Sequence, residues 1–478
     1  MPVVAEQTTQ GVHKERLSAT MVTILVVIIM AGVLFGYDQG VISGALHGIR
    51  RAFGLGPLLI EVVTSWVTLG ALFGSLLGGE LADRLGRKKA VLIAGALFTL
   101  GAVLQSLSPG AGVLVVGRLV IGSGVGVAAV AAPLYGAELA PAALRGRFVS
   151  CYQLAITIGI FLAYLIDAAL SGRDGAWRIM LGVAAVPGVL LVLVMLAAPE
   201  SPRWLMKMNR RGEARAALRR ARPGLEPDSR LDGIAAALRE DAHKATWREV
   251  FEPQWRRPMR VAIGLAVFQQ VTGINAIIYY ADAIFASAGF STTADQTLAT
   301  TWAIGGVNVL ATFIAIAFID RLGRRPLLLA GLVGMGISLV TVGIAFRFIG
   351  THAAGAGPSD AGLITLVALV VFIISFAFSL GPVTWTVINE IFPGRVRGRA
   401  VAVATAVNWG AAFVVSEFFL TLIGAIGTSA TFWLFAAFCL IGWIWVYRRV
   451  PETNGRSLEQ IEQIWGARDV VVRTLEPV

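Results

Sequence analysis

The sequence predicts an all-α membrane protein with twelve transmembrane helices, arranged as two six-helix halves that are parallel repeats of each other. Three observations support this fold class: the composition, the number of long apolar runs and a set of motifs that occurs twice. The 478 residues are 56% hydrophobic and 14% charged, with a mean hydropathy of +0.75. Soluble domains are about 45–50% apolar and about 25% charged. The composition therefore excludes a soluble globule and a disordered chain.

Twelve apolar runs are long enough to cross a bilayer, which takes roughly 20 residues each. They cover residues 20–46, 60–80, 90–108, 111–137, 148–170, 179–198, 260–286, 298–319, 326–349, 362–391, 399–423 and 430–447. The first run is too long for a cleaved signal peptide, so we expect it to remain as a helix.

The net charge of +11 is unevenly distributed between the two sides of the predicted membrane. One side carries most of the Lys and Arg residues, whereas the other has only Arg50, Arg51, Arg173, Arg178 and Arg347. Short loops rich in Lys and Arg stay in the cytoplasm. We therefore expect both termini to be cytoplasmic, and the basic excess to reflect topology and anionic lipid rather than nucleic acid.

Residues 199–257 form the one long polar stretch, and their pattern predicts short amphipathic helices. The expected organisation is a cytoplasmic tail over 1–19, a first half over 20–198, this cytoplasmic linker, a second half over 258–450 and a cytoplasmic tail over 451–478.

Three motifs occur once in each half with matching internal spacing. They are the pairs 83–88 and 320–325 (DRLGRK and DRLGRR), 138–147 and 390–399 (Glu, Pro, Arg, Gly and Arg at identical intervals), and 199–201 and 451–453 (PES and PET). Because each half has six spans, an even number, both halves enter the membrane in the same orientation. This arrangement predicts parallel repeats about an axis along the membrane normal.

The repeated motifs place carboxylates and arginines at the cytoplasmic ends of helices in both halves. Such groups can bridge the halves when the inside is closed, and must separate when it opens. The candidate cytoplasmic gate comprises Asp83, Arg84, Glu138, Arg145, Glu200, Asp320, Arg324, Glu390, Arg397 and Glu452. The alternative is that these residues are interfacial anchors, whose exposed salt bridges contribute about 0–1 kcal/mol each.

Two ionisable residues fall well inside the predicted spans, Asp38 and Arg118. Asp38 lies about nine residues (roughly 13 Å) and Arg118 about seven residues (roughly 10 Å) from the outer ends of their helices. The matching depths predict an ion pair. Arg118 favours the ionised form of Asp38 while the two touch, and desolvation favours the protonated form when they part. Alternatively, Asp38 caps a broken helix and Arg118 holds backbone carbonyls near the glycine-rich run 122–126.

Motifs along nearly the whole chain closely resemble those of the sugar porter family of the major facilitator superfamily. They are GYDQGVISG (36–44), GELADRLGRK (79–88), PLYGAELAPAALRG (133–146), PESPRW (199–204), QQVTGINAIIYY (269–280), DRLGRR (320–325), GPVTWTVINEIFPGRVRG (381–398) and PETNG (451–455). The resemblance implies a monomeric, multi-pass protein of the plasma membrane that needs no cofactor. Its proton-coupled members are similar to this chain in having Asp at the Asp38 position and Arg at the Arg118 position.

The resemblance also implies a sugar site, and the residue types fit one. Amides donate and accept hydrogen bonds, and an indole adds a donor and a flat face, which suits sugar hydroxyls and ring faces. The family's sugar-contacting positions correspond to Gln153, Gln269, Gln270, Asn275, Asn308, Trp385 and Asn408. Taken singly, each amide could instead hold two helices together. Trp409 is a further indole candidate, and Tyr279, Tyr280 and Phe35 are weaker ones.

Several positions depart from the family pattern or carry further expectations. Ile160 stands where some pentose-binding members have a second Gln, which favours a hexose-like pocket. Asp282 replaces a frequent Pro and has no assigned role, and Glu417 is expected on solvated surface. Pro382 predicts a bend in the tenth helix.

The hypothesis that follows is a proton-driven monosaccharide symporter, with the proton as coupling ion. A passive sugar facilitator, a membrane sugar sensor and a drug exporter are the alternatives, the last disfavoured by the neutral, amide-rich candidate pocket. The four histidines fall outside mid-membrane positions, and the sequence shows neither metal-ligand spacing nor a nucleophile triad. We therefore expect no metal, no catalytic residues and no enzymatic activity.

Overall fold

Twelve helical stretches in the structure are long and apolar enough to cross a membrane, as predicted. The structure is a computed structural model that describes residues 18–140, 145–221, 226–240, 248–349, 359–454 and 460. Parts of the 133–146 and 451–455 motifs and most of both predicted tails therefore lie outside the described residues.

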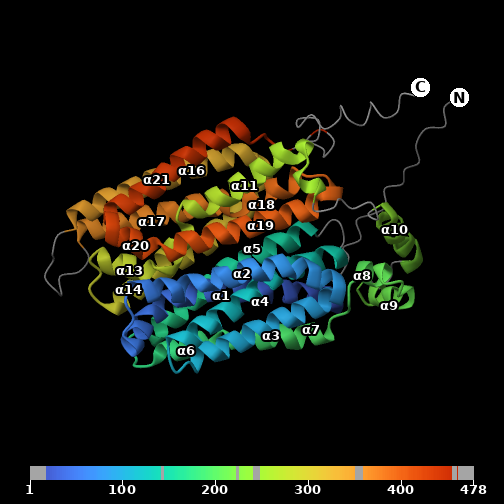
Figure 1. Ribbon diagram of the computed structural model, residues 1–478, viewed down its shortest axis with the longest axis horizontal. Coiled ribbons are helices and arrows are strands. Elements are labelled where there is room, and N and C mark those ends of the chain that lie inside the picture. Colours follow the sequence, from blue (N-terminus) through green and yellow to red (C-terminus); the bar gives the residue numbers. More distant parts are fainter. Residues whose placement is uncertain are drawn as a thin grey trace.

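The helices form two bundles that lie side by side (Figure 1). The first contains α1 (Ala19–Phe53), α2 (Pro57–Leu85), α3 (Arg87–Ser106), α4 (Ala111–Leu139), α5 (Arg145–Leu170), α6 (Ala176–Val183) and α7 (Ala185–Ala197). The second contains α11 (Arg256–Val271), α12 (Ile274–Tyr279), α13 (Ala281–Ser287), α14 (Thr293–Ala299), η5 (Thr300–Gly306), α15 (Val307–Leu322), α16 (Arg324–Phe348), α17 (Asp360–Phe378), α18 (Leu380–Glu390), α19 (Gly394–Glu417), α20 (Phe419–Ile426) and α21 (Thr428–Arg449).

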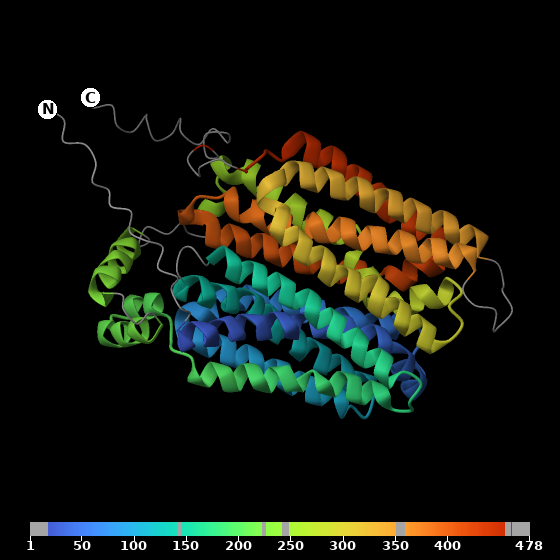
Figure 2. The same ribbon diagram turned by 180° about the vertical axis from the view of Figure 1, so that it is seen from behind.

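Three short helices of the linker lie at one end of the paired bundles (Figure 2). They are α8 (Pro202–Lys207), α9 (Arg211–Ala221) and α10 (Pro227–Glu240), and they share a small apolar core that includes Trp204, Leu218 and Leu231. The Ser18 hydroxyl donates to the Ala221 carbonyl at 2.7 Å, so α1 begins beside α9. We call this the linker end of the molecule and the opposite end the far end.

Glycines allow neighbouring helices of the first half to pack almost backbone to backbone. A Cβ on Gly36 of α1 would lie 1.8 Å from the Ile156 carbonyl oxygen of α5, and one on Gly122 of α4 would lie 2.0 Å from the Val67 carbonyl oxygen of α2. Helices in lipid gain little from the hydrophobic effect and associate through close packing, so such contacts hold the bundle together.

Several spans are interrupted, and the interruptions bear on the site. The seventh span, predicted as one run over 260–286, instead breaks at Thr272 and Gly273, where Gly273 has a φ of 93°, and again at Tyr280. The eighth contains η5, a π-helical turn over Thr300–Gly306. The predicted bend of the tenth span is confirmed, because the helix breaks at Ser379, three residues before Pro382.

The repeated DRLGR motif forms a tight turn between two helices. Gly86 and Gly323 separate α2 from α3 and α15 from α16 with φ values of 103° and 82°, a region that favours glycine. A Cβ on Gly86 would also lie 2.3 Å from Oε2 of Glu200. The first motif therefore needs glycine at Gly86 for two reasons: the backbone has a positive φ, and the Glu200 carboxylate approaches closely.

That carboxylate caps a helix in each half. Glu200 accepts from the Lys88 backbone N–H at 3.1 Å, at the start of α3. Glu452 accepts from the N–H groups of Arg324 at 3.0 Å and Arg325 at 3.1 Å, at the start of α16. The first N–H groups of a helix lack partners within the helix and attract anions.

The cap shifts the ionisation of Glu452. Burial opposes ionisation, but the backbone N–H groups of Asn454, Arg324 and Arg325 outweigh it and hold the pKa of the Glu452 carboxyl group below its ordinary value of 4.5. A group whose pKa is lowered by folding stabilises the folded state above its unfolded pKa, and loses that effect as the pH falls through its folded pKa.

We predict that Gly122→Ala lowers the melting temperature of the purified protein, because the added methyl group must push α4 away from Val67. Overpacking of this kind costs about 1–3 kcal/mol. The control is Gly79→Ala, whose Cβ meets nothing within 4 Å. Equal melting temperatures for the two variants would contradict the prediction.

We also predict that Glu452→Gln lowers the melting temperature at pH 7, and that its difference from the unaltered protein shrinks as the pH falls below 4.5. Thermal unfolding in detergent between about pH 7 and pH 3.5 measures this. Glu80→Gln is the control, because the Glu80 side chain is 57% exposed and pairs only with Arg84 in the described contacts. A difference that persists unchanged at the lowest pH would exclude the proposed cap as its cause.

Candidate functional site

The structure brings Asp38 and Arg118 together at the centre of the first half. Their side chains are 3% and 0% exposed, and Nη1 of Arg118 lies 2.7 Å from Oδ1 of Asp38. Asp38 lies within the continuous helix α1, so it does not cap a broken helix. The predicted pair therefore exists as an ion pair shielded from lipid and water.

Arg118 also donates to two backbone carbonyls. Its Nε reaches the Val63 oxygen at 3.0 Å and its Nη2 reaches the Thr64 oxygen at 3.2 Å. Both carbonyls belong to α2, not to the glycine-rich run of α4 that the sequence had suggested as an alternative partner. One guanidinium thus joins α1, α2 and α4, and it keeps two acceptors if Asp38 becomes neutral.

Four of the seven predicted sugar-contacting residues form one hydrogen-bonded network in the second half. The Asn275 amide donates to Gln270 at 2.8 Å, Gln270 donates to Asn408 at 3.1 Å, and Asn408 donates to Gln269 at 2.7 Å. Gln269 donates in turn to the Leu380 carbonyl at 2.8 Å, beside the break in the tenth span. All four side chains are at most 7% exposed.

A fifth amide, Gln39, joins this network from the first half, and the sequence analysis missed it. Its Nε2 donates to Oδ1 of Asn275 at 3.2 Å. Gln39 follows Asp38 directly in α1, and the signal that could have identified it is a second polar side chain in the same apolar run. Of these two consecutive residues of α1, Asp38 therefore belongs to the ion pair and Gln39 contacts the amide network.

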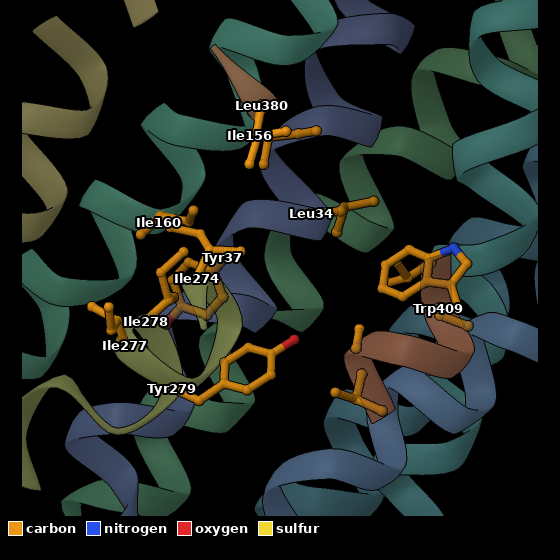
Figure 3. Packing of buried hydrophobic residues seen from close by; sticks show 14 of the residues in the cluster. Leu34, Tyr37, Ile156, Ile160, Ile274, Ile277, Ile278, Tyr279, Leu380 and Trp409 are labelled. Carbon is orange, nitrogen blue, oxygen red and sulfur yellow. The ribbon is translucent and has the colours of Figure 1, made fainter. Parts of the chain in front are cut away.

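The side chains of the other predicted sugar-contacting residues take part in no described hydrogen bond. Gln153 of α5 and Trp385 of α18 are half-buried, and Asn308 of α15 is 5% exposed. Figure 3 shows Trp409 and Tyr279 on different helices, with the Tyr279 hydroxyl directed into the interior between them. Trp409 packs on Phe35 of the first half, with ring centroids 5.3 Å apart.

At the far end, hydrogen bonds cross between the two halves. The carboxylate of Glu61 on α2, 1% exposed, accepts from the backbone N–H and the hydroxyl of Thr421 on α20, both at 2.6 Å. One turn along, the Ser65 hydroxyl donates to Glu417. The expectation that Glu417 lies on solvated surface was wrong, because it is half-buried against the opposite half.

At the linker end, the described contacts of the predicted gate residues join groups within one half or join a half to the linker. Arg87 lies 3.0 Å from Asp83 and 2.9 Å from Glu138. Arg84, a predicted gate residue, has a side chain that is 76% exposed and pairs with Glu80 of its own helix, whereas Arg87, which was not predicted, is buried.

The second half repeats this arrangement. Arg324, the counterpart of Arg87, lies 3.2 Å from Glu390, and the Thr453 hydroxyl donates to Glu390 at 2.6 Å. Arg397 donates to the Phe392 carbonyl at 2.9 Å. The side chains of Arg145 and Asp320 lie outside the described residues. A gate formed between the halves therefore stays a prediction.

Comparison with known proteins agrees with this architecture. A family described as "Sugar (and other) transporter" matches residues 24–465. The chain is 40% identical over 436 residues to the galactose-proton symporter of Escherichia coli strain K12, covering 91% of this chain and 92% of that protein. It is 39% identical over 440 residues to the D-xylose transporter of Levilactobacillus brevis, covering 91% and 93%.

A solved structure is similar over nearly the whole chain. It is the partially occluded inward open conformation of the xylose transporter XylE from E. coli, which is 29% identical, with a TM-score of 0.79 over 92% of this chain and 100% of that one. The extent of these matches decides the family: this multi-pass membrane protein belongs to the sugar transporter family.

Proposed function

We propose that the protein is a proton-coupled symporter that imports a monosaccharide across the plasma membrane by alternating access. The observation that carries the proposal is the position of Asp38 and Gln39, consecutive residues of which one contacts Arg118 and the other contacts the amide network. Relatives named as a galactose-proton symporter and a D-xylose transporter support the same activity.

The proton acts on the contact between α1 and α4. Protonation of Asp38 removes the charge that attracts Arg118, and Arg118 then keeps only the Val63 and Thr64 carbonyls as partners. Helix α1 is released from α4, and the position of Gln39 relative to Asn275 changes with it. No cofactor takes part, because the proton is the coupling ion.

The sugar binds where the amides now bond to one another. Each amide of the network has a donor and an acceptor, and so does a sugar hydroxyl. A hydroxyl can therefore take the place of one amide as the hydrogen-bond partner of another, and no buried polar group is left unpaired. Gln269, Gln270, Asn275 and Asn408 provide most of these groups, and Gln153, Asn308 and Trp385 surround the sugar from other helices.

Alternating access follows from movement of residues 20–198 against residues 258–450 within a single chain in the bilayer. The many Lys and Arg residues of the linker support a cytoplasmic location for the linker end. With the far end crossed by the Glu61–Thr421 and Ser65–Glu417 contacts, the described conformation is closed to the outside. The linker-end acids and arginines then act as the inner gate.

The proton gradient supplies enough energy for concentrative uptake. One charge moving through 100 mV releases about 2.3 kcal/mol, and about 1.4 kcal/mol supports a tenfold concentration ratio.

We predict that Asp38→Asn abolishes sugar accumulation against a gradient but retains sugar counterflow, because the amide occupies the same space without titrating. Uptake and counterflow in proteoliposomes with an imposed proton gradient measure both. Asp360→Asn, which changes an exposed acid in the first turn of α17, is the control and should accumulate sugar normally. If Asp38→Asn still accumulates sugar, coupling does not pass through Asp38; if the unaltered protein never accumulates it, the protein is a passive facilitator.

We predict that Gln270→Ala raises the KM of counterflow about tenfold with a smaller change in maximal rate. The variant removes the acceptor of Asn275 and the donor to Asn408, and each lost hydrogen bond is worth about 0.5–1.5 kcal/mol. Gln254→Ala, in the linker, is the control. Competition by glucose, galactose, xylose, arabinose and inositol identifies the sugar, and an unchanged KM for Gln270→Ala would place the sugar elsewhere.

A further inference from the structure

Two buried carboxyl groups at the far end have no part in the proposed mechanism. Asp167 on α5 is 1% exposed and Asp282 on α13 is 2% exposed. They belong to opposite halves and lie within electrostatic range of each other. Oδ1 of Asp167 and Oδ2 of Asp282 have no hydrogen-bond partner among the described residues.

Two adjacent residues of α1, Ser43 and Gly44, each form a hydrogen bond with one of the aspartates. The backbone N–H of Gly44 donates to Oδ2 of Asp167 at 3.2 Å, and the backbone N–H of Asp282 donates to the Ser43 hydroxyl at 3.0 Å. Gly44 allows this approach, since a Cβ there would lie 2.5 Å from Cγ of Asp167.

The π-helical turn η5 completes the enclosure. Its Thr300 hydroxyl donates to Oδ1 of Asp282, and its Thr301 hydroxyl donates to the Tyr164 carbonyl of α5 at 3.0 Å. The Tyr164 hydroxyl in turn donates to the Ile278 carbonyl at 2.9 Å. The two contacts of Tyr164 cross between the halves, so the site exists in this form only while the far end is closed.

The surroundings contain titratable groups but no cation in contact. Tyr37 on α1 and Tyr164 on α5 are close enough to feel the charge of the carboxyl groups, and their hydroxyls donate to the Met180 and Ile278 carbonyls. Among the described contacts, no Lys, Arg or His bonds to either aspartate. His47, one turn beyond Ser43 and Gly44 on α1, is exposed.

Two buried carboxylates without a cation cannot both stay ionised at low cost. If one is protonated, its charge no longer repels the charge of the other, so that one proton allows both groups to stay buried. When the halves separate at the far end, water reaches both groups and the proton is released.

We propose that Asp167 and Asp282 form a second proton-binding site, in which one proton shared between the halves stabilises closure of the far end. This deepens the proposed function, on which it rests for the identity of the far end as the outside. The site is separate from Asp38, which lies five positions before Ser43 in α1 and is paired with Arg118.

The test measures far-end closure directly. Spin labels are placed at Asp174, whose side chain is 99% exposed, and at exposed Ser291, one on each half, after Cys151 and Cys439 are replaced by Ala. All variants carry Asp38→Asn, so that the Asp38 site cannot contribute. Distances between the labels in lipid nanodiscs give the closed-to-open ratio between about pH 8 and pH 5.

In the Asp38→Asn background, the closed-to-open ratio should rise as the pH falls, by up to about tenfold per pH unit for one linked proton. Adding Asp282→Asn should keep the far end closed and make the ratio independent of pH within about twofold, because the amide is neutral, like the protonated acid, and does not titrate. Asp167→Asn should do the same, and it replaces Asp282→Asn if that variant does not fold. Asp360→Asn is the control and should keep the pH dependence.

An equal pH dependence with and without the two aspartates would overturn the proposal, as would a ratio that never responds to pH. A ratio that responds to Na⁺ but not to pH would also overturn it, since the bound ion would then not be a proton. Failure of the symport hypothesis has a different signature, which is the absence of sugar accumulation by the unaltered protein in the transport assay.

Discussion

The buried guanidinium of Arg118 is the constraint on which the first half depends. An unpaired charge in this position would cost several kcal/mol, so α1 and α2 must both present acceptors to this side chain of α4. Asp38, Val63 and Thr64 do so within 3.2 Å. The required closeness of α2 and α4 is possible because Gly122, one turn from Arg118, presents no side chain to Val67.

The two halves differ in backbone conformation at equivalent positions of the repeat. Gly36 and Gly273 occupy corresponding places in the repeat, because they are 237 positions apart, the same offset that separates the two DRLGR motifs. Gly36 is helical and packs against Ile156, whereas Gly273 has a φ of 93° and breaks its helix. The break directs Asn275 back toward Gln270, so the second half gains an amide network where the first has a continuous helix.

The sequence was sufficient to predict the twelve spans and the Asp38–Arg118 pair, because apolar length and depth in the membrane are local properties of the chain. It did not predict the break at Gly273, because a glycine in an apolar run can either continue the helix or end it, and the neighbouring residues do not distinguish the two cases. The roles of Glu61 and Glu417 were also missed. Each lies near a helix end, where solvent is the usual neighbour, and its partner comes from the other half of the chain, more than 350 positions away.

The carboxylate caps have a mechanical consequence. Glu200 follows the sixth span and holds the turn between the second and third, and Glu452 does the same after the twelfth. The last helix of each half is thereby fastened to its early helices. In each half these three helices therefore move together when one half shifts against the other.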